Sequence, residues 1–540
     1  MFDDSRYATE KEFISNLTRH RYGSLDKTGG VPLKADDNVL YSDDGDSHTL
    51  IFGNTGTKKT RNFVIPSVYT MAAAGENMII ADPKGEIYRF TSGYLTHLGY
   101  DLKVVNLRFP ERGSMWNPLA LPFYYYTHDD VDRAVEMVTD LAMQLKTTIH
   151  SEKDLYWENQ AVDLFVGIVL ALFDCSNDES TVNMESIEYI RMKIEIEDPD
   201  DESTMGFWNF CRMFKEGTLI AYKLASVYSL RRVEKTLSCV LSTFDIMLRA
   251  FFINRKLMDM TSRSEIDFDS LLNPKTAIYL IMPDEKTTYH FLVSVFVKQC
   301  YEYIIMKAQN FKGNSLSTRL NFVLDEFSNF PKIADMSAMI SAARSRNIRF
   351  VLIVQSKQQL IKLYGDDSET IKSNCKNWIF LPCREKDLLN EISELCGTVF
   401  IQGRGYRPLI NNMQLQNLKI GWEYSEALIL RPQCMPYIAK VMDFSMYPAS
   451  EYEEIELTAR KFPEAVVFDP VDYYEWFINK LSEDDDEASE ELEDLFDDAY
   501  PDKPFDTGFH QDGLKGFYTK KSGYSGDGDD DDDDDDSTES

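Results

Sequence analysis

The sequence lacks several features that would assign it to other protein classes. Its eight cysteines form no C-x-x-C pair, so metal and disulfide sites lack suitable spacing and small buried thiols are expected. The longest apolar stretch, AVDLFVGIVLALF at 161–173, is too short to cross a bilayer and contains Asp163. The polar first residues, MFDDSRYATEKEF, contain no secretory signal. These absences predict a soluble protein in a reducing cytoplasm.

Positive charge is also scarce. The net charge is −33, but residues 481–540 hold 24 acidic residues against 4 lysines, which leaves −13 for the other 480 residues. A body of this charge does not coat itself nonspecifically with DNA, although a locally basic pore is compatible with the total.

The C-terminal segment 471–540 is predicted to be a disordered acidic tail, because like charges this dense cannot pack. It ends in eight aspartates, Asp529 to Asp536. Within it, EELEDLF and GLKGFY contain apolar residues that a partner could bind. A solubilising tail and a partner-binding tail both remain open.

The body shows the alternation of short strands and helices that is typical of an α/β fold with a parallel sheet. Residues 1–48 are polar and predict an irregular lead-in, and Pro66 predicts a kink in a helix over 59–74. Residues 126–265 have helical spacing throughout and predict an all-α domain between two α/β parts, 49–125 and 266–470. Strands are expected at 49–52, 77–81, 102–106, 276–282, 320–324, 348–354, 377–381 and, as the last, 426–430.

A glycine-rich loop follows the first of these strands, in TLIFGNTGTKKT at 49–60. Gly53, Lys59 and Thr60 match the phosphate-binding pattern G-x-x-x-x-G-K-[ST]. In such a loop, backbone N–H groups surround phosphates, the lysine contacts the β- and γ-phosphates, and the hydroxyl holds Mg²⁺. The predicted nucleotide-binding residues are Gly53, Asn54, Thr55, Gly56, Thr57, Lys58, Lys59 and Thr60.

Lys58 departs from this pattern, because it occupies the position of the second glycine. A side chain there could cost about 1–3 kcal/mol of backbone strain or block the phosphates. Alternatively, its long stem could point outward and add a cation beside an anionic ligand.

A second candidate element is LNFVLDEF at 320–327, an apolar strand that ends in two carboxylates. This is the form of a Walker B strand, in which Asp325 holds the Mg²⁺ shell and Glu326 activates the attacking water as a general base. A strand end with two solvated acids is the alternative.

The third element is AARSRNIRFVLIVQS, in which Arg344, Arg346 and Arg349 precede a strand that ends at Gln355. In ring-shaped motors, an arginine reaches the γ-phosphate of the neighbouring subunit and a polar residue at a strand tip senses it. Arg344 or Arg346 is predicted to act in this way, with Gln355 as the sensor. A solvated turn or a DNA contact would also account for the arginines.

The segment from Ile79 to Leu119 resembles the region after the P-loop in TraG/TraD-type conjugative coupling proteins, the ATPases that feed substrates into type IV secretion channels. The residues that carry the resemblance are Asp82-Pro83-Lys84-Gly85-Glu86, Gly99-Tyr100 and Asn117-Pro118. LDEFSNFPKI, ARSRNIRFVLIVQS and NCKNWIFL look like later motifs of that family. The similarity covers roughly residues 40–445, in order.

The resemblance implies a RecA-like nucleotide-binding domain, a homohexameric ring that uses ATP and Mg²⁺, and single-stranded DNA or a relaxase–DNA complex as cargo. The helical domain would face the cargo, and the tail would recruit partners such as the relaxosome. Many members begin with transmembrane helices. Since none is recognised here, the resemblance implies a soluble form that channel components recruit to the inner face of the cell membrane.

Two functions follow from these expectations. The first is a DNA-translocating ATP hydrolase encoded by a mobile genetic element and acting in conjugation. The second is a coupling or adaptor protein that does not hydrolyse ATP, in which Lys58 has disabled the P-loop and the acidic tail recruits relaxase. The intact LDEF string favours the first, because a decayed enzyme would accumulate changes there as well.

Overall fold

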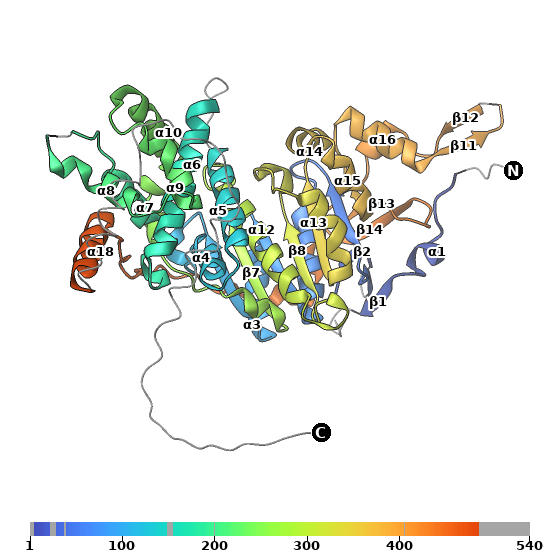
Figure 1. Ribbon diagram of the computed structural model, residues 1–540. Coiled ribbons are helices and arrows are strands. Elements are labelled where there is room, and N and C mark those ends of the chain that lie inside the picture. The colour runs from blue at the N-terminus through green and yellow to red at the C-terminus, as the bar shows by residue number, and fades with distance from the viewer. Residues whose placement is uncertain are drawn as a thin grey trace, which may run out of the picture. The chain divides into compact units, whose positions relative to one another are not determined.

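The computed structural model describes residues 5–21, 29–36, 39–147, 155–198, 200–403 and 405–484 (Figure 1). The chain divides into two compact units. The larger comprises Met1–Arg191 and Cys239–Phe468, and the smaller comprises Met192–Ser238 and Asp469–Ser540. Most of the predicted acidic tail, including its eight aspartates, lies outside the described residues.

The larger unit is built on a nine-stranded sheet in the order β14-β13-β10-β4-β9-β8-β5-β7-β6. The seven strands from β10 to β6 are parallel, which confirms the predicted parallel sheet, and two antiparallel strands, β13 and β14, extend its edge. The strands are β4 (His48–Phe52), β5 (Asn77–Asp82), β6 (Asp101–Asn106), β7 (Thr276–Ile281), β8 (Leu320–Leu324), β9 (Ile348–Val354), β10 (Cys375–Phe380), β13 (Tyr424–Leu430) and β14 (Tyr437–Met442).

All eight predicted strands are present, but the prediction that 426–430 is the last strand is wrong. β14 follows it and pairs along its length with β13. Buried positions of β14 are interspersed with half-buried ones, so YIAKVM lacks the continuous apolar run that marks the central strands.

Helices cover both faces of the parallel strands. On one face, α2 and α3 share a core with Val323 and Val351. On the other, Tyr301 of α12 lies against Phe322 and Phe350, whose rings stack with their centroids 4.9 Å apart. Because successive side chains alternate between faces, burial of both faces explains the continuous apolar runs. The helices of this part are α2 (Ile65–Ala73), α3 (Glu86–His97), α12 (His290–Ala308), α13 (Met336–Ala343), α14 (Lys357–Tyr364), α15 (Asp367–Asn374), α16 (Lys386–Cys396) and α17 (Asn412–Gln416).

The predicted irregular lead-in over 1–48 is wrong for its described residues. They form a helix and a three-stranded antiparallel sheet in the order β1-β3-β2. β2 is an edge strand, where Pro32 is tolerated, and it packs against β14. The burial of these strands comes from contacts with distant parts of the chain, which their polar local sequence does not reveal. The elements are α1 (Glu10–Ile14), β1 (Thr18–Arg21), β2 (Val31–Asp36) and β3 (Val39–Asp43), and a further hairpin comprises β11 (Thr398–Ile401) and β12 (Gly405–Pro408).

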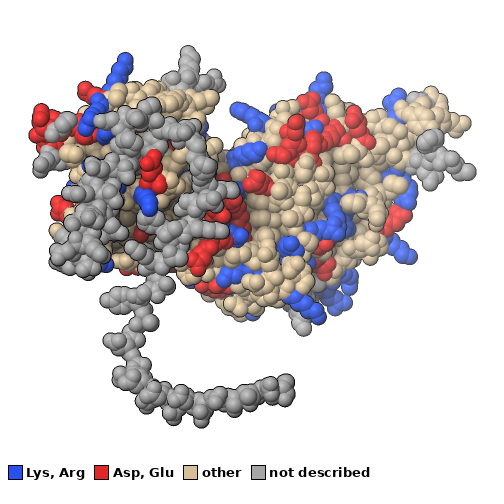
Figure 2. Space-filling view, viewed as in Figure 1, with Lys and Arg blue, Asp and Glu red and all other residues tan. Residues whose placement is uncertain are grey.

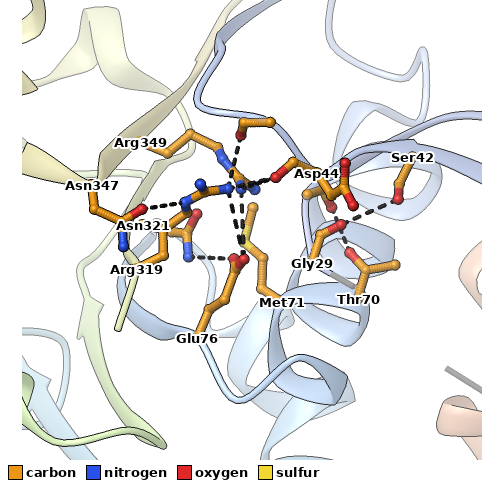
Figure 3. Close-up of polar contacts among 12 residues, drawn as sticks. Gly29, Ser42, Asp44, Thr70, Met71, Glu76, Arg319, Asn321, Asn347 and Arg349 are labelled. Atoms are coloured by element: carbon orange, nitrogen blue, oxygen red, sulfur yellow. Dashed lines mark hydrogen bonds and ion pairs between the residues drawn. The ribbon is translucent and has the colours of Figure 1, made fainter. Parts of the chain in front are cut away.

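A buried arginine joins the amino ends of several elements (Figure 3). Arg349 of β9 is 3.6 Å from the Glu76 carboxylate and donates to the Asp44 carbonyl over 3.3 Å. Arg319 donates to the same carbonyl over 2.6 Å, and Asn321 donates to Glu76 over 2.9 Å. Arg349 therefore lies inside the sheet, where it tethers the β3–β4 connection to the turn before β5.

Between β6 and β7 the described residues form helices and no strand, as predicted. The boundaries 126–265 of a separate all-α domain stay a prediction. The helices are α4 (Ala120–Thr127), α5 (Val131–Lys146), α6 (Leu155–Cys175), α7 (Met184–Met192), α8 (Gly206–Arg212), α9 (Leu219–Tyr228), α10 (Glu234–Phe252) and α11 (Arg255–Met260).

The smaller unit corrects the start of the predicted disordered tail. Helix α18 (Pro470–Asp484) packs against α8. A Cβ on Gly206 would lie 2.8 Å from Val471, and the rings of Phe210 and Tyr473 meet edge to face. The apolar residues of VDYYEWF make this segment a helix, although acidic residues follow it.

Among the described residues, no helix is both long and apolar enough to cross a membrane. All eight cysteines are free thiols, and six of them are buried, as predicted.

Charged side chains of both signs lie over one face of the larger unit. Figure 2 shows acidic side chains gathered over α14, α15 and α16. The exposed acids of this region are Asp366, Glu369, Asp387 and Glu394, and the exposed bases Lys362, Arg384 and Lys386 lie among them.

Candidate nucleotide-binding site

The candidate site lies where the parallel strands end. The P-loop, Gly53–Thr60, leaves the carboxyl end of β4, which lies beside β9 and β10 in the sheet. Gly53 N–H donates to the Val354 carbonyl at the end of β9 over 3.3 Å. In open α/β sheets, ligands bind at the carboxyl ends of the strands.

A π-helical turn, Thr60–Val64, follows the loop and leads into α2. In a π-helix each N–H bonds to the carbonyl five residues before it, and Ile65 N–H accordingly donates to the Thr60 carbonyl. Pro66, where the sequence predicts a kink, follows the π turn directly in a continuous helix, and it has no N–H to donate to the carbonyls of the preceding turn. The break in the helix therefore takes the form of a π turn directly behind the loop, a type of turn often found at functional sites.

Two positions of the loop favour glycine, for different physical reasons. At Gly53, a Cβ would lie 2.7 Å from Thr57 Oγ1 and 2.9 Å from Leu381 Cβ, so the backbone is too closely packed for a side chain. At Gly56 there is space, but φ is +85°, a conformation that glycine adopts without strain.

Lys58 adopts the backbone conformation of the glycine that it replaces, with φ of 62°. This conformation costs a non-glycine residue about 1–2 kcal/mol. Its side chain points away from the loop: Nζ donates to the Gly421 carbonyl over 2.7 Å and lies 3.5 Å from Asp443 Oδ2. Of the two arrangements considered from the sequence, the outward one is therefore present.

Lys59 is buried and bonded to the loop itself. Its Nζ donates to the carbonyls of Gly53 and Asn54 over 2.6 and 3.3 Å. Burial lowers the pKa of Lys59, and the carboxylates of Glu326 and Asp325 oppose this effect. The ammonium thus lies inside the loop, with the two acids that follow β8 close by.

Thr60 and Asp325 form the predicted metal-binding pair. Thr60 Oγ1 donates to Asp325 Oδ2 over 3.0 Å. Burial, followed by the neighbouring Glu326 carboxylate, raises the pKa of Asp325 to about 7. A hydroxyl and one carboxylate suit Mg²⁺, which keeps much of its shell for water and phosphate oxygens. In the described part of the chain, no three His, Cys, Asp or Glu residues converge to hold a metal ion unaided.

Glu326 and Gln355 are joined to the P-loop by hydrogen bonds. Gln355 Nε2 donates to Glu326 Oε2 over 2.5 Å, and Gln355 Oε1 accepts from Thr55 Oγ1 over 3.1 Å. Asn329 also donates to Glu326, over 3.3 Å. Gln355 thus links the loop to the acid, and its role as a phosphate sensor stays a prediction.

Asp82 is the last residue of β5, and its side chain binds the backbone at the start of α3. Its buried carboxylate accepts from Tyr88 N–H over 2.8 Å and from Lys84 N–H over 3.4 Å. Burial raises its pKa to about 6. In the DPKGE string, this aspartate therefore caps the start of α3.

Arg344 and Arg346 do not reach this site within one chain. They precede the amino end of β9, and the seven residues of that strand separate them from Gln355 by about 20 Å. Arg344 Nε donates to Asp46 over 2.5 Å, and Arg346 donates to the Asn314 carbonyl over 3.2 Å. An arginine finger from either residue would have to serve the site of a neighbouring subunit.

Sequence reasoning missed the residues that hold the outward Lys58. Asp443, just after β14, accepts a bidentate pair from Arg61 over 2.8 and 2.7 Å. Lys58 also lies near Trp422, with Nζ 5.1 Å from the ring centroid. No local signal marks these partners, since they are more than 360 residues from the loop in sequence.

A strand, a glycine-rich loop, a helix and an acidic strand end, arranged in this way, define a P-loop nucleotide-binding protein. A family model described as "Type IV secretory system Conjugative DNA transfer" matches residues 3–435, and the chain belongs to this family. The resemblance to type IV coupling proteins that was noted in the sequence is thereby confirmed.

Individual proteins show the same similarity. Over 387 residues the chain is 26% identical to the conjugal transfer protein TraG of Escherichia coli, covering 67% of this chain and 57% of TraG, little more than half of its length. The plasmid coupling protein TrwB with the ATP analogue ADPNP is 18% identical, with 86% of this chain and 99% of that chain covered and a TM-score of 0.53. TrwB with ADP and Mg²⁺ is 19% identical, with 83% and 97% covered and a TM-score of 0.52. The fold is therefore the RecA-like α/β fold of these proteins.

Proposed function

We propose that the chain is an ATP-hydrolysing coupling protein that pumps single-stranded DNA, as a relaxase–DNA complex, into a type IV secretion channel. The observation that carries the proposal is the Thr60–Asp325 pair beside a complete P-loop backbone. The similarity to TrwB, which has been solved with ADPNP and with ADP and Mg²⁺, supports ATP and Mg²⁺ as the ligands of this site.

Each residue of the site has a role in this proposal. The backbone N–H groups of the loop bind phosphate oxygens, and Lys59 exchanges its bonds to loop carbonyls for bonds to phosphate. Thr60 and Asp325 hold the Mg²⁺, which neutralises phosphate charge when bound. Glu326 accepts the proton of the attacking water, and Gln355 links this acid to Thr55 of the loop.

The proposed working assembly is a homohexamer. Because Arg344 and Arg346 lie far from the site of their own chain, a complete hydrolytic site requires a second subunit. The ring is proposed to work in the cytoplasm, at the inner face of the membrane, where channel components recruit it. The acidic C-terminal segment is proposed to recruit relaxase.

A second candidate is an adaptor protein that binds relaxase but does not hydrolyse ATP. Two observations favour it: Lys58 stands in a conformation that suits glycine, and Lys59 is bonded to the carbonyls of the loop. The first strains the backbone of the loop, and the second closes the loop on itself, so Lys59 must give up these bonds before it can contact phosphate.

Assays of ATP binding and hydrolysis with the purified full-length chain distinguish the motor from the adaptor. The motor proposal expects Mg²⁺-dependent ATP hydrolysis that single-stranded DNA stimulates and that Glu326→Gln abolishes, a result that would exclude the adaptor. If the wild type binds no nucleotide whereas Lys58→Gly does, the motor proposal fails. Deleting 485–540 should spare hydrolysis and weaken relaxase binding. Unchanged relaxase binding would reduce this segment to a solubilising tail.

A further inference from the structure

An exposed tryptophan stands next to the P-loop. Trp422 lies in the loop between α17 and β13 and is 81% exposed. A tryptophan side chain this exposed forgoes the stabilisation that burial of its large apolar ring would provide. Tryptophan is enriched at binding interfaces, because its ring combines a large apolar surface with a polar N–H.

The loop that carries Trp422 has a defined backbone. Glu426 N–H donates to the Lys419 carbonyl over 2.7 Å, and the Glu426 side chain accepts from Lys419 N–H over 3.0 Å. A Cβ on Gly421 would lie 2.4 Å from the Tyr424 carbonyl, so the turn before Trp422 is tight. The Trp422 ring is therefore carried by a loop whose backbone is fixed by hydrogen bonds and a tight turn.

Lys58 holds this loop to the P-loop. Its Nζ donates to the carbonyl of Gly421, the residue before the tryptophan, and its charge lies 5.1 Å from the indole centroid. Asp443 fixes the other side of the ammonium and also binds Arg61, in the first turn after the P-loop. The Lys58 side chain thus connects the backbone of the P-loop to the loop that carries the Trp422 ring.

We infer that Trp422 stacks on the base of the bound nucleotide and that Lys58 is the positioning residue that keeps the ring beside the phosphate loop. The inference rests on the proposed nucleotide-binding function. The ring centroid lies 5.1 Å from the end of the Lys58 side chain, so the ring is separated from the loop, as the ribose separates the phosphates from the base in a nucleotide. Aromatic stacking tolerates every base, so the ring adds affinity without selecting between adenine and guanine.

Inorganic pyrophosphate provides the discriminating probe, because it has phosphates but no base. Calorimetric titration of the full chain, with Mg²⁺ present, measures ADP, GDP and pyrophosphate binding to the wild type, Trp422→Ala and Trp422→Phe. Trp422→Ala should weaken ADP and GDP binding by about tenfold each and leave pyrophosphate binding unchanged. Trp422→Phe should retain most of the ADP affinity, because it keeps an aromatic face.

Two further variants complete the test. Trp476→Ala, which removes another exposed tryptophan, should change none of the three affinities. Lys58→Gly should weaken ADP binding more than pyrophosphate binding, since it frees the Trp422 loop and so removes the ring from the base, which pyrophosphate lacks.

The outcomes separate this inference from the function on which it rests. If Trp422→Ala binds ADP like the wild type, the inference is overturned and the ATPase proposal stands. If the variant loses ADP and pyrophosphate equally, the ring supports the loop and does not stack. A wild type that binds neither ADP nor pyrophosphate overturns both the inference and the proposed function.

Discussion

Thr60 Oγ1 donates to Asp325 Oδ2 over 3.0 Å, although 265 residues separate the two positions. The bond joins the last residue of the P-loop to the residue that follows β8, two strands away from β4 in the sheet. It brings a hydroxyl and a carboxylate together at the carboxyl edge of the sheet. These are oxygen ligands that suit the Mg²⁺ proposed for this site.

The first prediction concerns this pair. Asp325→Asn should remove the effect of Mg²⁺ on nucleotide affinity, because a neutral amide replaces the carboxylate that contacts Thr60. ADP binding in Mg²⁺ should then fall to the level measured in EDTA, as titration calorimetry would show. Thr60→Ser is the matched control, since it keeps the hydroxyl and should preserve the Mg²⁺ effect. An Asp325→Asn protein that still binds ADP more tightly in Mg²⁺ would refute the assignment.

The second prediction concerns the proposed general base. Glu326→Gln should bind ATP with near wild-type affinity and hydrolyse it about 10²–10⁴-fold more slowly, because the amide cannot accept the proton of water. Release of phosphate measures the rate, and equilibrium binding of ATP measures the affinity. Asn329→Ala removes a weaker bond to the same acid and should have a much smaller effect. Equal losses in the two variants would assign Glu326 a structural role.

The strands of the fold could be predicted where both faces of the sheet are covered. β8 and β9 were predicted with their observed bounds, because burial on both sides makes LNFVL and IRFVLIV continuously apolar. β2 and β14 could not be recognised in the same way. They pack against each other across some 400 residues of chain, and neither local sequence shows that contact.

The same distinction applies to the candidate site: residues in local patterns could be predicted, and contacts between distant segments could not. Some candidate residues lie in short sequence motifs at the ends of strands, so the motif and the preceding apolar strand were enough to predict them. They are Gly53, Thr60, Asp325 and Glu326. The orientation of Lys58 was open, because it depends on Gly421 and Asp443, which only the folded sheet brings near. The positions of Arg344 and Arg346 relative to the site likewise followed from the direction of β9 and not from their spacing.

The third prediction concerns pH and the buried ring of His48. Phe350 N–H donates to its Nδ1 over 2.9 Å, and Nε2 lies 2.9 Å from the Ile340 carbonyl, an arrangement that fits a neutral ring with the proton on Nε2. Burial lowers the pKa of His48 to about 4. The unfolded chain therefore binds a proton that the folded chain does not, and stability should fall as the pH drops from about 6.5 to about 4, by about 3 kcal/mol in total.

Thermal unfolding of wild type and His48→Asn between pH 7.5 and 4.5 would measure this effect. The wild type should lose more stability with falling pH than the variant, which has no ring to protonate. His128→Asn, which removes a histidine from the surface of the helical segment, should leave the pH dependence as it is in the wild type. Parallel curves for wild type and His48→Asn would contradict the prediction.

The last prediction concerns an arginine supplied between subunits. Arg344→Ala and Glu326→Gln should each abolish ATP hydrolysis while leaving ATP binding intact, since one removes the finger and the other the base. When the two proteins are mixed and allowed to assemble, some sites will combine Glu326 of the first with Arg344 of the second. Hydrolysis should then reappear in proportion to mixed assembly, as phosphate release would show.

Two further variants sharpen this experiment. Asp46→Asn breaks the ion pair of Arg344 without removing the arginine, so it should hydrolyse ATP like the wild type. Arg346→Ala, mixed with Glu326→Gln in the same way, tests the other candidate finger. Because Arg344 lies at the far end of β9 from Gln355, activity can return on mixing only if the arginine acts on a neighbour. Failure of both arginine variants to complement Glu326→Gln would exclude this pair of residues as the finger.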